Sequence, residues 1–191
     1  MSHARNWDDA HLHVPSLNLE RPAQDEVCVA LGSNIGNRLT YIHRGLDFLS
    51  TLQVGSNSMS MSSLYETEPV ACPPGSPHFL NAVCVMKCWL EPLQLLLALK
   101  NFEKKMGRNL ESDRNSPRPL DLDIIYFGSC ECSSPELTLP HPRAHTRKFV
   151  LLPLAELRPH LLLPGQSMTV VQLLGTLNNA EKLHRVTRQP E

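Results

Sequence analysis

The chain has 191 residues, a length that suits a single domain with one hydrophobic core. Its 18 lysines and arginines nearly balance its 19 aspartates and glutamates, so overall charge favours neither nucleic acid nor an anionic membrane as a partner. Any bound anion must therefore be held by a local cluster. No apolar run comes near the roughly 18 residues that cross a bilayer. We expect no nucleic-acid partner and no membrane association.

Residues 1–26 contain five acidic side chains and no apolar stretch. This composition is typical of a disordered or processed extension and argues against a secretory signal, so the folded domain is expected to start near Val27. The six cysteines lie mostly in strand-like apolar runs, which favours a reducing compartment, and we expect a cytoplasmic protein. Cys130 and Cys132 lack the second close pair of a zinc finger, so metal ligation by cysteine is disfavoured.

The first half of the chain alternates between strand and helix patterns. Residues 26–31 form an apolar run with strand propensity, which ends at the turn-forming cluster 32–37. Residues 38–52 then repeat apolar side chains at helical spacing. Two more strand-like segments, 58–65 and 81–90, flank a loop in which five of twelve residues are Pro or Gly. The pattern predicts a strand, a turn, a helix and two hairpin-like strands.

The second half begins with a helix over residues 91–106, where Pro92 suits the first turn and Gly107 the stop. A polar stretch leads into a strand over residues 120–127. The later patterns are two short helices, residues 148–157 and 169–177, and then a polar tail.

The element order β-α-β-β-α-β is the split βαβ arrangement, in which two helices pack on one face of an antiparallel sheet. We therefore predict an α+β, ferredoxin-like fold for a single domain over residues 27–177. The extension 1–26 precedes this domain, and a C-terminal tail over residues 178–191 follows it.

Asp121 and Asp123 stand at the start of the predicted strand 120–127. Alternation along a strand points both carboxylates to one face, while Leu122 and Ile124 point to the other. Paired hard oxygen ligands suit magnesium, which nucleotide sites bind through one or two carboxylates together with phosphates and waters. Taken alone, such a pair is a weak signal, because a solvated strand end explains it more often than a metal site does.

Basic residues near this pair favour a phosphate site. Arg108, Arg114 and Arg118 precede it in a loop whose end is fixed by prolines, and guanidinium groups can grip phosphate oxygens in pairs. A second patch contains no acid in eight residues, although the first turn of a solvated helix normally favours Asp or Glu. Its basic members are His141, Arg143, His145, Arg147 and Lys148.

The turn at residues 32–36 follows the first strand, as phosphate loops do, but it matches neither G-x-x-x-x-G-K-[ST] nor G-x-G-x-x-G. We interpret it as a structural turn with a helix cap supplied by Ser33 or Asn34, without a catalytic role. By pattern alone, Phe79 and Phe149 are ordinary core residues.

Six short motifs occur in order along the chain: ALGSNIGNR, LYETEPV, FLNA, GR, PRPLDLDI and LPHP, which begin at residues 30, 64, 79, 107, 117 and 139. Together they resemble the hydroxymethyldihydropterin pyrophosphokinase family, and the resemblance covers residues 27–177. Each motif is modest, but six in register are strongly diagnostic. The resemblance implies transfer of pyrophosphate from ATP to 6-hydroxymethyl-7,8-dihydropterin in folate biosynthesis, with AMP as the leaving group. We also expect a monomer.

The resemblance further implies a role for each site residue. Asp121 and Asp123 would hold a pair of magnesium ions, and Asp123 is also a candidate hydrogen-bond acceptor for the attacking hydroxyl, although magnesium makes it a weak base. Arg108 and Arg118 would stabilise charge on the transferred group and on AMP. The other ATP contacts would be Arg114, His141 and Arg147, and the pterin contacts Thr67, Val70, Phe79, Asn81 and Phe149.

The chain departs from the common family pattern at Leu110, where a second arginine is frequent, and at Asn115, where a tryptophan is frequent. Both departures weaken the lid over the site, which must then rely on the arginines of residues 108–118 and is expected to order when both substrates bind.

Two alternative functions stay open. One is an ordinary kinase for a small alcohol; the other is a ferredoxin-like RNA-binding module, although no strand has the basic and aromatic signature of such modules.

Overall fold

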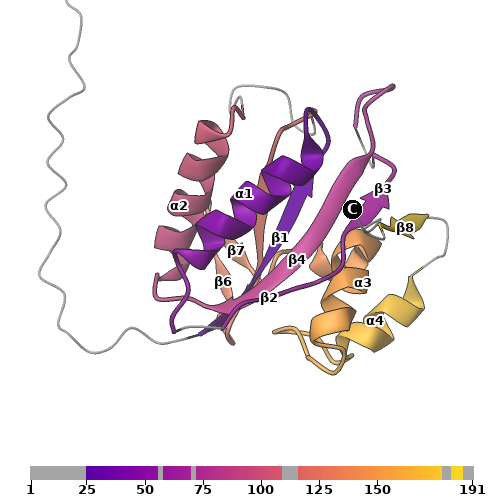
Figure 1. The fold of residues 1–191 in the computed structure, drawn as a ribbon. Coiled ribbons are helices and arrows are strands. Elements are labelled where there is room, and N and C mark those ends of the chain that lie inside the picture. Colours follow the sequence, from indigo (N-terminus) through magenta and orange to yellow (C-terminus); the bar gives the residue numbers. More distant parts are fainter. Residues whose placement is uncertain (1–24, 56–57, 70–71, 109–115, 178–181, 187–191) are drawn as a thin grey trace, which may run out of the picture.

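The structure, a computed structural model, describes residues 25–55, 58–69, 72–108, 116–177 and 182–186. Most of the expected N-terminal extension lies outside these ranges. The elements, in chain order, are β1 (Glu26–Ser33), α1 (Arg38–Ser50), β2 (Ser60–Met61), β3 (Tyr65–Thr67), β4 (Phe79–Lys87), α2 (Pro92–Lys105), β5 (Asp121–Phe127), β6 (Cys132–Ser133), β7 (Thr138–Leu139), the 3-10 helix η1 (Ala144–Thr146), α3 (Lys148–Leu157), α4 (Val170–Thr176) and β8 (Leu183–Arg185) (Figure 1).

The main sheet has the strand order β5-β1-β4-β3-β8, with β2 also pairing β4, and all its pairings are antiparallel. The units β1-α1-β3 and β4-α2-β5 each skip one strand of this order. This is the split βαβ topology, so the predicted α+β, ferredoxin-like fold is confirmed. The central strand β4 is buried over all but its last residue, which explains its continuous apolar sequence.

Helices cover both faces of the sheet (Figure 1). On one face α1 and α2 contact the strands, and Val27, Val29 and Leu31 of β1 belong to the core cluster there. On the other face α3 contacts β4 and α4, and Cys28 and Ala30 of β1 pack into that cluster. The period of two along a strand lets β1 contribute to both cores. The helices α3 and α4 therefore add a second layer to the arrangement expected from the sequence.

Three local features differ from the expected pattern. The strand expected over residues 58–65 is broken into β2 and β3. Residues 183–185, expected in a polar tail, form β8 and pair with β3 at the sheet edge. The predicted helix cap is wrong, because Asn37 caps α1: its side chain accepts a hydrogen bond from the Thr40 N–H at 3.1 Å.

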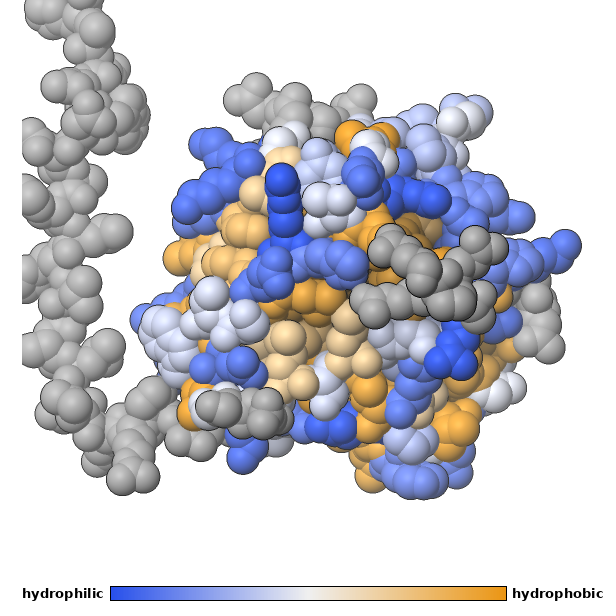
Figure 2. Space-filling view, in the orientation of Figure 1, coloured by the Kyte–Doolittle hydropathy of each residue, from blue (hydrophilic) through white to orange (hydrophobic). Residues whose placement is uncertain are grey.

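Figure 2 shows the side of the molecule on which α1 and α2 lie, where polar and apolar residues are mixed. Within the described ranges, no helix combines the length and the apolar character needed to cross a bilayer. The predicted site residues of the sheet point to the opposite face, under α3.

Candidate active site

Three neighbouring strands bring predicted site residues together at one end of the sheet. Gly32, near the end of β1, pairs with Asn81 of β4 on one side and with Asp121 of β5 on the other. Residues paired directly across strands point to the same face, so the amide and the carboxylate flank the glycine. A Cβ atom at Gly32 would lie 3.0 Å from Asn81 Oδ1, 3.6 Å from Phe79 Cδ1 and 3.8 Å from Asp121 Cβ. A side chain at this position would crowd Asn81, so the glycine keeps the space between the predicted pterin and metal residues free of one.

Asp121 and Asp123 face the same side of β5, as the alternation predicts. Leu122 and Ile124 are buried in the core under α1 and α2, so the carboxylates point the other way. The side chains of Asp121 and Asp123 are 15% and 35% exposed. Among the described residues, no group of three His, Cys, Asp or Glu side chains could hold a metal ion. Two partly exposed carboxylates nevertheless fit magnesium, which usually keeps waters and phosphate ligands beside one or two protein carboxylates.

Both oxygens of Asp121 contact predicted catalytic arginines. Arg108 Nη1 lies 2.6 Å from Oδ1, and Arg118 Nη2 lies 2.8 Å from Oδ2. Burial alone would lower the pKa of Arg108, but the carboxylates of Asp121 and Glu103 raise it. The guanidinium therefore stays charged beside the predicted metal site.

The basic segment before α3 approaches the second carboxylate. The His141 N–H donates to the Ile125 carbonyl at 2.8 Å, which ties this segment to β5. Burial lowers the pKa of Arg147 and neighbouring Arg143 lowers it further, whereas Asp123 raises it. Burial also lowers the pKa of His141 against the attraction of Asp123, so the imidazole is neutral near pH 7. Arg147 is thus the permanent cation of this pair.

The pterin residues predicted on β3 and β4 form a linked group. Asn81 Nδ2 donates to Thr67 Oγ1 at 2.8 Å, and both residues are buried. Phe79 pairs with Thr67 across the strands, and the Arg118 guanidinium lies 5.6 Å from the centre of its ring. Because Nδ2 is held by Thr67, the carbonyl oxygen of Asn81 is directed toward Gly32.

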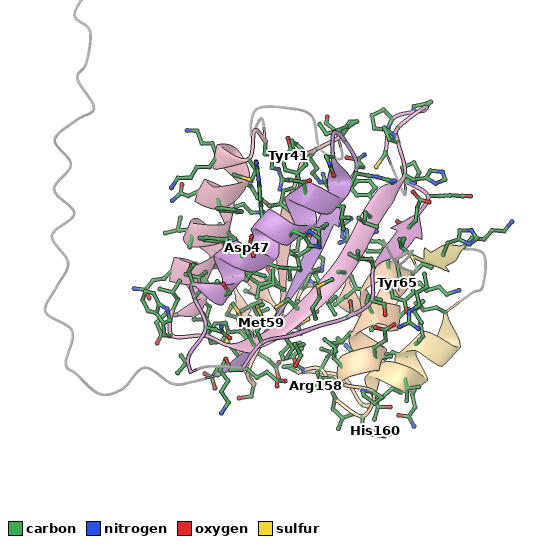
Figure 3. All side chains as sticks on the ribbon, in the orientation of Figure 1. Tyr41, Asp47, Met59, Tyr65, Arg158 and His160 are labelled. Atoms are coloured by element: carbon green, nitrogen blue, oxygen red, sulfur yellow. The ribbon has the colours of Figure 1, made fainter. Side chains whose placement is uncertain are left out.

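Phe149 lies in the first turn of α3, on the same face of the sheet. Its ring packs at the margin of the second core, with the Arg147 guanidinium 5.3 Å from the ring centre. Glu156 fastens α3 to the sheet, because its carboxylate accepts hydrogen bonds from the Tyr65 hydroxyl and, at 2.7 Å, from the Ser63 N–H. Figure 3 shows Tyr65 beside α3. The helix that carries Phe149 is therefore fixed against β3.

Asn34, in a turn that we interpreted as purely structural, connects two parts of the site. Its Oδ1 accepts from the Arg118 N–H at 2.7 Å, and its own N–H donates to the Arg118 carbonyl at 3.2 Å. Its Nδ2 donates to the Pro77 carbonyl at 3.4 Å, two residues before Phe79. Asn34 thereby positions the backbones of an arginine and an aromatic residue of the site, a role that its sequence motif does not reveal.

Glu103 and Lys100 of α2 also belong to the site, and the sequence analysis missed them. Glu103 is fully buried, and its carboxylate contacts Arg108, Lys100 and the Leu122 N–H. Burial raises the pKa of Glu103, while Lys100 and Arg108 lower it. The signal was present, because Glu103 continues the buried stripe of Leu95 and Leu99 at a spacing of four residues. An acid in an apolar stripe needs a partner.

Some predicted residues cannot be placed. Val70 and Arg114, together with the departures from the family pattern at Leu110 and Asn115, lie outside the described residues. The lid therefore stays a prediction.

Comparison with known proteins identifies relatives of most of the chain. The family model for 7,8-dihydro-6-hydroxymethylpterin-pyrophosphokinase matches residues 28–159. A "Folate synthesis bifunctional protein" of Arabidopsis thaliana is 43% identical over 140 residues, which are 73% of this chain and 28% of the relative. The "2-amino-4-hydroxy-6-hydroxymethyldihydropteridine pyrophosphokinase" of Haemophilus influenzae is 35% identical over 140 residues, 73% of this chain and 86% of the relative. The chain thus spans 28% of the plant relative and most of the bacterial one.

A solved structure supports the fold. Plasmodium falciparum HPPK-DHPS, crystallised with pterin and p-hydroxybenzoate, superposes with a TM-score of 0.62 at 16% identity, over 82% of this chain and 43% of the other. At this identity the likeness concerns the fold alone. The family model and the identity to the bacterial relative establish more: the chain belongs to the 7,8-dihydro-6-hydroxymethylpterin-pyrophosphokinase family.

Proposed function

We propose that this protein transfers pyrophosphate from ATP to 6-hydroxymethyl-7,8-dihydropterin, giving AMP and the pterin diphosphate for folate biosynthesis. Family membership and the names of the relatives support pyrophosphate transfer in this synthesis. The observation that carries the proposal is the row of Asn81, Gly32 and Asp121 across three strands. It sets an amide that can hydrogen-bond to a heterocycle and a carboxylate that suits magnesium on the two sides of a glycine.

The pterin would lie over Gly32, between Asn81 and Asp121. Phe79 borders it, and Phe149 lies on the same face, so a flat ring can stack on aromatic faces there. The Asn81 carbonyl oxygen, directed toward Gly32, can accept a hydrogen bond from a ring N–H group. The substrate hydroxymethyl group would then be held near Asp121.

Magnesium and the ATP phosphates would bind on the Asp121 side of Gly32. Asp121 and Asp123 would hold a pair of magnesium ions, which would neutralise charge on the phosphates. Arg108 and Arg118, which contact Asp121, can bind phosphate oxygens through the same fork of N–H donors. Arg147 would add a further cation, and His141, neutral when free, would donate or accept a hydrogen bond.

In the proposed reaction the pterin hydroxymethyl oxygen attacks the β-phosphorus of ATP. A new oxygen–phosphorus bond forms as the hydroxyl proton passes to water, the bond to the α,β-bridging oxygen breaks, and AMP leaves with the bonding electron pair. The stacking residues and Asn81 orient the nucleophile, Arg108 and Arg118 stabilise charge on the moving group, and Asp123 accepts a hydrogen bond from the attacking hydroxyl. Positioning and electrostatics are what phosphoryl transfer requires of a protein.

Product analysis tests this proposal. The protein should convert ATP, magnesium and the pterin to AMP, whereas ADP would indicate an ordinary kinase. Asp121→Asn and Asp123→Asn should keep the fold and nearly abolish AMP formation, because they remove charge without changing size. Asp47→Asn, at an exposed position of α1 (Figure 3), is the matched control. Normal turnover in both site variants would contradict the metal assignment, and retention of RNA at physiological salt would favour a binding module.

We also propose a cytoplasmic monomer. Burial raises the pKa of the thiols of Cys28, Cys84 and Cys88, as is typical of unreactive packing cysteines. A Pisum sativum relative carries "mitochondrial" in its name, so cell fractionation should test the compartment. Light scattering should test the mass.

A further inference from the structure

The outer edge of β5 has an unusual partner at the residue between the two aspartates. β5 is an edge strand of the main sheet, with β1 on its inner side. The Leu122 N–H donates to Glu103 Oε1 at 2.6 Å, and the Leu122 carbonyl accepts from Lys100 Nζ at 3.5 Å. Two side chains of α2, three residues apart, thus take the place of a neighbouring strand at this one residue. They hold the backbone from which Asp121 and Asp123 project.

Glu103 simultaneously holds an arginine of the site. Arg108 Nη1 lies 2.6 Å from Glu103 Oε1 and 2.6 Å from Asp121 Oδ1, so two carboxylates share one nitrogen. The Glu103 side chain is 0% exposed, whereas that of Asp121 is 15% exposed. The buried Glu103 carboxylate cannot leave this contact without losing the nearer of its two counter-ions, whereas Asp121 can turn toward other cations. Glu103 is therefore the fixed anchor of Arg108.

Lys100 completes the group. Its Nζ lies 3.2 Å from Glu103 Oε2 and 4.0 Å from Asp123 Oδ1, so it bridges the buried acid and the second predicted metal ligand. The ion-paired groups here are three carboxylates, of Glu103, Asp121 and Asp123, and three cations, of Lys100, Arg108 and Arg118. Removing one buried charge would leave its partners unbalanced.

We propose that Glu103 and Lys100 are positioning residues for pyrophosphate transfer. Glu103 keeps Arg108 in place when Asp121 turns to magnesium, and Glu103 and Lys100 together fix the backbone on both sides of Leu122, from which the two aspartates project. This inference rests on the proposed function. In this proposal neither side chain touches substrate. Loss of either one should therefore slow the chemical step more than it weakens pterin binding.

Glu103→Gln tests the anchor, because glutamine keeps the size and the acceptor for the Leu122 N–H but removes the charge that holds Arg108. Its turnover number should fall by about tenfold or more, while the pterin dissociation constant stays within about twofold. In a sample with ¹⁵N-labelled leucine, the Leu122 amide proton should move upfield, since a neutral acceptor replaces a carboxylate. Glu136→Gln, at an exposed position, should change none of these quantities.

Lys100→Met is the second variant, since Lys100 is partly exposed and its removal should affect folding less than a change at buried Glu103. Lys100→Met should lower turnover severalfold and retain pterin affinity. The control Lys104→Met, at an exposed position of the same helix, should leave turnover unchanged. Wild-type turnover of folded Glu103→Gln would overturn the proposal, as would wild-type turnover of Lys100→Met should Glu103→Gln fail to fold. If the wild-type protein itself released no AMP, the proposed function would fail instead, a separate result.

Discussion

Replacing Arg118 by methionine should strengthen the binding of a divalent metal ion and at the same time lower turnover. Arg118 Nη2 lies 2.8 Å from Asp121 Oδ2, and Arg108 takes the other oxygen, so a metal ion must compete with guanidinium groups for this carboxylate. A hydrogen bond between charged groups contributes about 1.5–3 kcal/mol, and partial exposure favours the lower end. Removal of the Arg118–Asp121 hydrogen bond, which contributes about 1.5 kcal/mol, should therefore lower the dissociation constant of a metal ion in the absence of nucleotide by about tenfold.

Manganese binding measured by electron paramagnetic resonance, without nucleotide, gives the affinity, and AMP formation gives the turnover. Turnover should fall by about a hundredfold, because in the proposed reaction Arg118 stabilises charge that develops in the transition state. Pterin affinity should stay nearly intact. Arg158→Met is the matched control, since Arg158 forms another arginine–carboxylate pair, with Glu26 at the opposite end of β1. Unchanged or weaker manganese binding in Arg118→Met would refute competition at Asp121.

Three further variants test single contacts. Phe149→Ala should raise the pterin dissociation constant about tenfold by calorimetry, because lost stacking and burial amount to about 1.5 kcal/mol, and an unchanged constant would make Phe149 a core residue only. Gly32→Ala should also weaken pterin binding, since its methyl group would lie 3.0 Å from Asn81 Oδ1. Wild-type pterin affinity would show that the pterin does not lie over Gly32. For Glu26, burial raises the pKa, but bonds from Arg158 and Tyr126 lower it below its ordinary 4.5 overall. Urea unfolding should therefore show Glu26→Gln to be less stable than wild type by about 1 kcal/mol at pH 7, a difference that disappears as the pH falls below 4.5; a pH-independent difference would contradict the linkage.

Features that depend on short-range periodicity were predictable from the sequence. The period of two placed Asp121 and Asp123 on one face, and burial of Leu122 and Ile124 confirms it. Helix boundaries followed from Pro92 and from apolar spacing, and the element order was sufficient to predict the split βαβ topology. These signals are local, since each is set by neighbours within one or two turns or strands.

Features that depend on which segments meet were not predictable. Gly32 reads as an ordinary turn glycine until the register sets it between Asn81 and Asp121. β8 forms in a polar segment because β3 offers it an open edge, which no local propensity records. Glu103 differs from these, because its place in the apolar stripe of α2 can be read from the sequence. Its partners cannot, since the Leu122 N–H of β5 and the Arg108 guanidinium that compensate its burial are brought to it by the fold.

The balance of charge at the end of β5 bears on how substrates bind. The ion-paired groups there are three carboxylates and three cations, and Arg147 adds a further positive charge beside Asp123. Magnesium alone would add to this positive charge and ATP alone would leave excess negative charge, and unpaired charge is costly in a partly buried site. A complex of ATP with a pair of magnesium ions would change the net charge little, since its phosphates would attract the arginines and its cations the aspartates they release. Exchange of partners, rather than addition of one ligand to a vacant carboxylate, is therefore the binding step that this arrangement favours.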